Sequence, residues 1–109
     1  HTFTPVMDGK VRPMDIGLLF DSGRSRERAL CDAWRGAIRL HGPGLRVFMN
    51  RPYTGRSDGF TRELRHHFPA SGYQGIELEV NQRHVRRNRL DAVVAGVLRA
   101  SLDTVIRGH

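Results

Sequence analysis

The chain has 109 residues, of which 39% are hydrophobic, 7% aromatic and 27% charged, and its formal net charge is +7. This length fits a single domain over residues 1–109, and the sequence has no apolar run approaching the roughly 18–20 residues that span a bilayer. The one cysteine, Cys31, excludes an intramolecular disulfide and a cysteine-based zinc finger. We therefore expect a cytoplasmic protein with no membrane partner.

Arginine supplies seventeen of the eighteen basic side chains, and Lys10 is the exception. Guanidinium groups bind carboxylates and phosphates through paired hydrogen bonds, so the excess is compatible with an acidic ligand. The alternative is a genome of high GC content that encodes most surface cations as arginine. The spread of the arginines along the chain favours this alternative.

The first half of the chain predicts a turn, two strands and a helix. Asp8-Gly9 signals the turn, and the apolar run Ile16–Phe20 predicts a strand buried on both faces. Apolar residues recur at helical spacing from Glu27 to Leu40, and the segment His41–Gly44 ends this helix. Leu45–Met49 predicts the second strand.

The second half begins with a loop over residues 50–60 and a short helix over Thr61–His67. Polar and apolar residues alternate over Ile76–Asn81, which predicts a third strand. The last helix is predicted to start at the capping-box-like Asn88–Asp91, and its apolar stripe extends to Ile106. Strands that alternate with helices predict an α/β fold, with a mostly parallel or mixed sheet flanked by helices.

Polar residues follow each predicted strand. Asp21 follows the first strand, and Asn50 and Arg51 follow the second. Glu79 and Asn81 end the third. Because ligands of open α/β sheets bind beyond the carboxyl ends of the strands, we expect these side chains at one edge of the sheet.

Two of these groups suggest chemistry, and each has a simpler alternative. Glu77 and Glu79 project from one face of a strand, where a carboxylate could serve as a general base, or they form its solvated face. Arg51 could hold a substrate carboxylate with help from Asn50, on a turn stiffened by Pro52. The alternative is an ordinary turn with a surface arginine.

A basic segment precedes the predicted last helix, with four arginines in seven residues: Arg83, Arg86, Arg87 and Arg89. Phosphate binding would use such a segment. However, no aromatic side chains are interleaved for base stacking, and cations at a helix N-terminus oppose the helix dipole. We therefore do not expect a nucleic-acid partner.

Four segments together resemble a known family. His1–Val6, Ile16–Asp21, Asn50–Gly55 and Ile76–Val80 occur in this order in the C-terminal half of the N-formylglutamate amidohydrolase (N-formylglutamate deformylase) family. The resemblance covers nearly the whole chain. It implies the α/β fold of zinc carboxypeptidases, with this chain as the C-terminal part of a larger domain.

The resemblance also implies an activity. The family is a group of metal-dependent hydrolases, and the implied reaction cleaves the amide of an N-formyl or N-acyl amino acid such as N-formylglutamate. His1 would be a ligand of zinc or another divalent metal, and Glu79 would be the catalytic base toward the metal-bound water. Asn50 and Arg51 would bind the substrate carboxylate, and Tyr53 would shape the pocket. The other metal ligands are expected upstream of this sequence.

A second hypothesis is a non-catalytic α/β module whose basic surface binds an acidic partner or, less favoured, a nucleic acid. The chain is also expected to be able to self-associate, because a truncated sheet would expose an edge strand and part of its apolar core.

Overall fold

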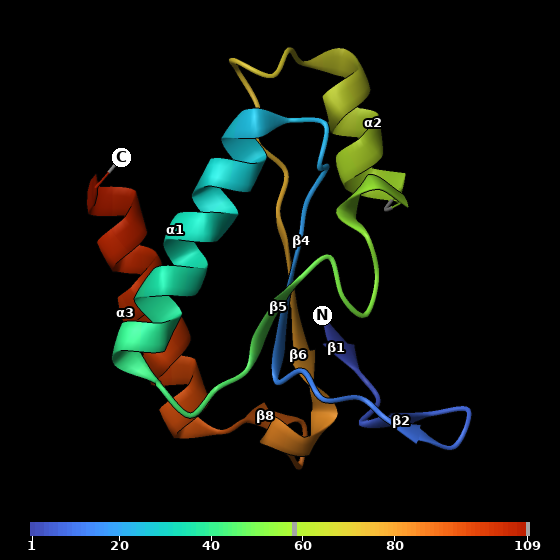
Figure 1. Ribbon diagram of the computed structural model, residues 1–109, viewed down its shortest axis with the longest axis vertical. Helices are drawn as coiled ribbons and strands as arrows, with labels where there is room; N and C mark the ends of the chain where they lie inside the picture. The colour runs from blue at the N-terminus through green and yellow to red at the C-terminus, as the bar shows by residue number, and fades with distance from the viewer. Residues whose placement is uncertain (58, 109) are drawn as a thin grey trace.

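The computed structural model describes residues 1–57 and 59–108 and has a four-stranded mixed sheet at its centre (Figure 1). The strand order is β1-β6-β4-β5, where β1 is Thr2–Phe3, β6 is Glu77–Asn81, β4 is Ile16–Leu19 and β5 is Val47–Met49. β1 is parallel to β6, β4 is parallel to β5, and β4 and β6 are antiparallel. The predicted α/β fold with a mostly parallel or mixed sheet is confirmed.

Three α-helices flank the sheet: α1 (Ser25–His41), α2 (Gly59–His67) and α3 (Ala92–Gly108). In Figure 1, α1 and α3 lie together on one side of the strands and α2 lies on the other side. Two short hairpins and two 3-10 turns complete the described chain: β2 (Val6–Met7), β3 (Lys10–Val11), β7 (Val85–Arg86), β8 (Arg89–Leu90), η1 (Gly55–Ser57) and η2 (Gln82–His84). None of the described helices combines the length and apolar character needed to cross a bilayer.

The predicted start of the last helix at Asn88–Asp91 is wrong, because α3 begins only at Ala92. Arg87 and Asn88 have positive φ angles of 50° and 62° and form the turn between β7 and β8. Asp91 caps α3 instead, because its carboxylate accepts the backbone N–H groups of Val93 and Val94, each at 3.1 Å. The predicted turn at Asp8-Gly9 is confirmed as the β2–β3 hairpin, where both residues have positive φ.

The apolar core lies between the sheet and the pair α1 and α3. Ile16 and Leu18 project into it from β4, and both side chains are fully buried. The indole N–H of Trp34 on α1 donates to the hydroxyl of Ser101 on α3 at 3.0 Å, which joins the two helices. Cys31 is buried in this core. Burial is the main cause that raises the pKa of its thiol to about 12, and the nearby Glu27 and Asp32 carboxylates add to it. Cys31 is therefore a core side chain and not a nucleophile.

A buried ion pair connects α1 to α2. Glu27 is fully buried in the first turn of α1, and its carboxylate accepts from Arg65 Nη2 at 2.8 Å and Arg65 Nε at 2.9 Å. It also accepts the backbone N–H groups of Asp21 and Gly75. Arg65 in turn donates to the carbonyls of Gly55 and Gly75, at 2.9 and 2.7 Å. One side-chain pair thus fixes two helices and three loops.

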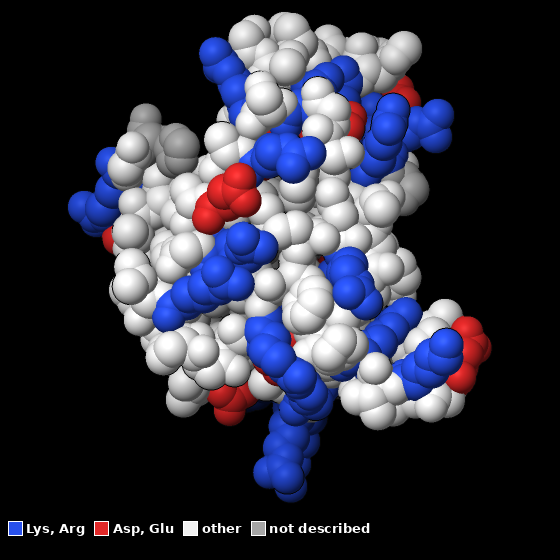
Figure 2. Space-filling view, viewed as in Figure 1, with Lys and Arg blue, Asp and Glu red and all other residues white. Residues whose placement is uncertain are grey.

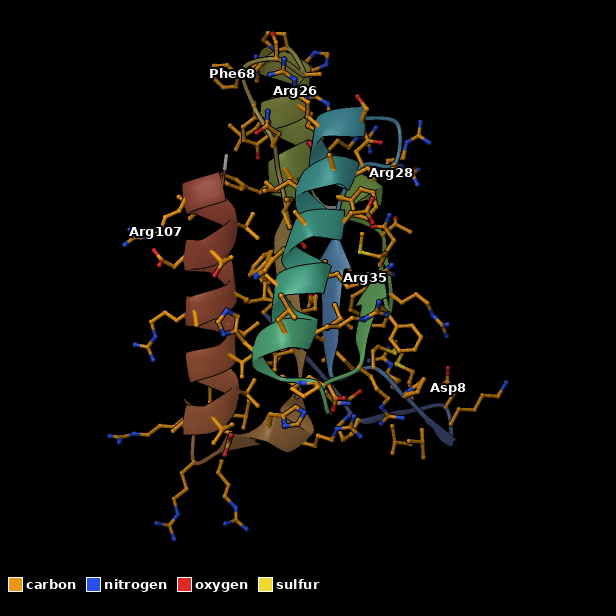
Figure 3. The ribbon with its side chains drawn as sticks, turned by 60° about the vertical axis from the view of Figure 1, so that its left-hand side comes forward. Asp8, Arg26, Arg28, Arg35, Phe68 and Arg107 are labelled. Carbon is orange, nitrogen blue, oxygen red and sulfur yellow. The ribbon has the colours of Figure 1, made fainter. Side chains whose placement is uncertain are left out.

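Substitution Arg65→Met should lower the free energy of unfolding by about 3–5 kcal/mol, because it leaves the Glu27 carboxylate buried without its cation. Arg107→Met is the matched control, because its ion pair with Asp103 is exposed on the outer side of α3 (Figure 3) and contributes less than about 1 kcal/mol. Chemical denaturation measures both. Equal effects of the two substitutions would show that the buried pair does not hold the fold.

The same pair predicts how stability depends on pH. Burial alone would raise the pKa of Glu27, but its hydrogen bonds from Arg65 and the two backbone N–H groups outweigh burial and lower the pKa below the usual 4.5. A group whose pKa is lower in the folded state stabilises the fold fully above its unfolded pKa and loses this contribution as pH falls through the folded pKa. The unfolding free energy should therefore stay level down to about pH 5 and decrease below it. An increase on acidification would contradict this prediction.

Candidate functional site

The face of the sheet opposite α1 and α3, here called the site face, carries a row of four residues. Gly17 of β4 is paired with Glu79 of β6 and with Phe48 of β5. His1 stands beside Glu79, because its amino group donates to the carbonyl of Leu78 at 3.1 Å and its carbonyl accepts from the N–H of Val80 at 3.0 Å. Residues that lie side by side on neighbouring strands project from the same face. The row is therefore His1, Glu79, Gly17 and Phe48.

The loop after β5 brings Arg51 onto this row. A Cβ atom placed on Gly17 would lie 2.0 Å from the Arg51 carbonyl oxygen, so the loop backbone occupies the space that any side chain at this position would need. The Arg51 guanidinium lies over the ring of Phe48, with its Cζ atom 5.2 Å from the ring centroid. Arg51 remains exposed to solvent. The sheet and the loop thus place three of the predicted site residues on the same face, with His1 beside Glu79 and Arg51 over Phe48.

Glu79 is buried, with 6% of its surface exposed. The alternative that this strand presents a solvated face is wrong for Glu79, because the loop that carries Arg51 and Pro52 lies over the neighbouring Gly17. Glu77, two residues nearer the start of β6, is half-buried. Removing a carboxylate from water costs free energy. The burial of Glu79 is therefore the feature of this face that most requires an explanation.

Asn50 shapes the loop. It has a positive φ of 54°, and its side-chain oxygen accepts the backbone N–H groups of Phe20 at 2.9 Å and Gly55 at 3.2 Å. These bonds hold both ends of the loop against the end of β4. Only the amide nitrogen of Asn50 is left for the predicted contact with a substrate, which stays a prediction.

Tyr53, the remaining predicted site residue, is half exposed and is held by Arg12. Arg12 Nη2 donates to the Tyr53 hydroxyl at 3.3 Å, and the Arg12 Cζ atom lies 5.4 Å from the Tyr53 ring centroid and 5.6 Å from that of Phe3. No local pattern predicts this contact, because Arg12 follows a hairpin that is distant from Tyr53 along the chain.

The expected gathering of polar residues at one sheet edge is wrong for Asn81. Because β6 runs antiparallel to β4, the end of β6 lies at the opposite edge from Asp21 and Asn50. There Asn81 is fully buried, donates to the Met14 carbonyl at 3.1 Å and accepts the Arg83 N–H at 3.0 Å. Glu79 lies two residues before this end of β6, where it pairs with Gly17 and not with the residues at the edge.

A second polar cluster occupies that opposite edge, around Asp15. Its buried carboxylate accepts from Arg83, from the backbone N–H of Arg46 at 2.7 Å and from His84 Nε2 at 2.8 Å. Burial would raise the pKa of Asp15, but these hydrogen bonds and the charge of Arg83 lower it. One cation of the predicted basic segment is thus engaged within the fold. In Figure 2 the basic side chains of the visible face lie in separate patches, not in one continuous stripe.

The described residues do not fit a catalytic zinc centre by themselves. Such a centre takes three protein ligands and leaves a fourth position for water. Within residues 1–57 and 59–108, no group of three or more histidine, cysteine, aspartate or glutamate side chains is placed to hold a metal ion. On the site face, His1 and Glu79 are the candidates that the row brings together.

The comparison with known proteins agrees with this fold. No protein-family model matches the sequence, and no curated protein matches it. Among solved structures, the chain is similar to gene product Atu2144 from Agrobacterium tumefaciens, with 31% sequence identity and a TM-score of 0.74. The match covers 99% of this chain and 40% of that chain. The chain is therefore an α/β protein with a mixed sheet flanked by helices. It spans about two-fifths of the length of Atu2144.

Gly17→Ala tests the close approach of the loop to the sheet. The added methyl group must displace the Arg51 carbonyl, so we expect a loss of about 1–3 kcal/mol in unfolding free energy and NMR shift changes over residues 50–55. Gly36→Ala is the control, because nothing lies within 4 Å of its Cβ position on α1 and alanine favours a helix. If Gly17→Ala left the signals of residues 50–55 in place, the loop would not depend on this contact.

Proposed function

We propose that this chain contributes the residues that bind the substrate carboxylate and accept a proton in a hydrolase related to N-formylglutamate amidohydrolases. The hydrolase cleaves the amide of an N-formyl or N-acyl amino acid. One observation supports this proposal most: Arg51 and Glu79, from separate segments, lie on the same face of the sheet, where His1 is beside Glu79 and Arg51 packs over Phe48. The sequence resemblance assigns roles to the same three residues. The match to part of Atu2144 supports the fold alone.

In this mechanism, Arg51 binds the α-carboxylate of the substrate through two parallel hydrogen bonds. Its packing over Phe48 restricts the guanidinium and so fixes the direction in which the substrate extends. The amide carbonyl is then directed toward Glu79. Tyr53, held by Arg12, borders the same loop and shapes the side of the pocket.

Glu79 carries the proton in the reaction. As a water molecule attacks the amide carbon, the Glu79 carboxylate accepts a proton from it, and the same proton passes to the nitrogen as the C–N bond breaks. The products are formate, or another carboxylic acid, and the free amino acid. Because the described residues do not supply three metal ligands, no step here is assigned to zinc; His1 is the residue of this chain that a metal held by further ligands would engage.

A non-catalytic module that binds an acidic ligand is the second candidate, and the exposed guanidinium of Arg51 also fits it. Both candidates use Arg51, and they differ at Glu79. Formate release from an N-formyl amino acid, measured with added zinc and with a chelator, separates them, since only the hydrolase releases formate and loses this activity with the chelator.

Arg51→Ala should weaken the binding of an N-formyl amino acid about tenfold or more, because a charged pair of hydrogen bonds is lost. Isothermal titration calorimetry measures this effect, with Arg107→Ala as the control at a distant exposed arginine. Glu79→Gln should leave affinity within about threefold of wild type and should suppress turnover. Near-normal turnover in Glu79→Gln would overturn its assignment as the base.

A further inference from the structure

A groove runs along the outer edge of the sheet beside β5, the last strand in the order β1-β6-β4-β5. It has a volume of about 720 Å³. Arg35 and Arg39 line it from α1, and the rest of its lining comes from the segment 43–49, which ends with β5. In Figure 3, Arg35 lies on the side of α1 toward β5. The groove is thus bounded by a basic helix and by the edge of a strand.

The edge of β5 that faces the groove carries backbone hydrogen-bonding groups. The Arg46 carbonyl accepts a backbone N–H of β4 at 3.1 Å, and the Asn50 N–H donates to a carbonyl of β4 at 2.9 Å. Backbone groups alternate in direction along a strand, so Val47 and Met49 direct their N–H and C=O groups away from β4. Such an edge is a template for an extended peptide, which adds to the sheet through main-chain hydrogen bonds.

The groove is basic, and no acidic side chain of the described residues lines it. Arg46 also lines it and is compensated in part, because its Nε atom lies 3.5 Å from the Asp15 carboxylate. The ion pairs of the described residues do not include Arg35 or Arg39. Asp32, one turn before Arg35 on α1, is not part of the lining. The helix wall therefore keeps an excess of positive charge, which favours a ligand with carboxylates.

The spacing of the two arginines matches the repeat of a strand. Arg35 and Arg39 are four residues apart on a helix that runs alongside the sheet (Figure 1), which separates them by about 6 Å. Every second residue of an added strand would project toward α1, and such residues are about 6–7 Å apart. Acidic residues at these positions would each meet one guanidinium. A second copy of the chain fits less well, because it would bring the same arginines to this edge and like charges repel.

We infer that the edge of β5 binds an extended acidic segment of a partner protein, which adds a strand to the sheet. The main-chain groups of Val47 and Met49 bind the backbone of this segment, and Arg35 and Arg39 pair with its alternate carboxylates. The inference is independent of the proposed function, because neither the substrate clamp nor the proton acceptor takes part in it.

The test titrates the protein into a short, capped and fluorescently labelled peptide in which glutamate alternates with valine, and measures its anisotropy. We expect the wild type to bind this peptide about tenfold or more tightly than the same peptide with lysine in place of glutamate. The double variant Arg35→Gln/Arg39→Gln should weaken binding of the glutamate peptide about tenfold or more. Arg62→Gln/Arg99→Gln removes the same charge from exposed positions outside the groove and should stay within about threefold of wild type. Glutamine favours a helix, so circular dichroism should be the same for all variants.

A second peptide tests the strand pairing separately from the charge. N-Methylation of the glutamate peptide removes its backbone N–H groups and keeps its carboxylates, so it should weaken binding about tenfold or more. The amide NMR signals of Val47 and Met49 should shift with the unmethylated peptide alone.

Three outcomes would overturn the inference. If the methylated peptide binds equally well, the groove takes any extended polyanion and strand addition is wrong. If Arg35→Gln/Arg39→Gln binds the glutamate peptide as the wild type does, the two arginines do not select the partner. If sedimentation velocity shows a dimer that the peptide does not dissociate, a second copy occupies this edge.

Discussion

The carboxylate of Glu27 has no exposure to solvent, and the elements around the end of β4 are arranged to neutralise it. Arg65 from α2 supplies the charge, and the N–H groups of Asp21 and Gly75 complete its hydrogen bonds. Because Arg65 also binds the Gly55 carbonyl, the ion pair holds the far end of the loop that begins at Asn50. The near end of that loop is fixed by the contact of Arg51 with Gly17. The position of Arg51 on the site face thus depends on the Glu27 carboxylate of α1, which acts through Arg65 and Gly55.

Local patterns were enough to predict most helices and strands, and they were not enough to predict how the strands pair. The alternation over Ile76–Asn81 identifies β6, but its direction depends on the path of the chain through α2 and the following loop, which no local pattern encodes. Asn81 was therefore expected at the wrong edge. Glu27 was missed for a related reason: a glutamate in the first turn of a helix is typical of a solvated helix start, and its partner Arg65 is 38 residues away. Arg51 and Glu79 could be singled out because each stands out locally, one at a strand exit and one within an alternating strand, and their roles stay predictions.

In the proposed function the site face combines a carboxylate clamp and a base, and its described residues do not complete a metal centre. Arg51 is exposed and packed on Phe48, which suits a group that must meet a ligand. Glu79 is buried beside His1, so bulk solvent does not surround the carboxylate that the proposal assigns as proton acceptor. The proposal therefore assigns to this chain the carboxylate clamp and the proton acceptor. A catalytic zinc would need further ligands besides the described residues.

The most direct test of this account is a crystal structure of the protein with N-formylglutamate bound. The account predicts the α-carboxylate on Arg51 and the amide within hydrogen-bond distance of the Glu79 carboxylate. A ligand bound away from the site face, or an amide separated from Glu79 by the Arg51–Pro52 backbone, would contradict it.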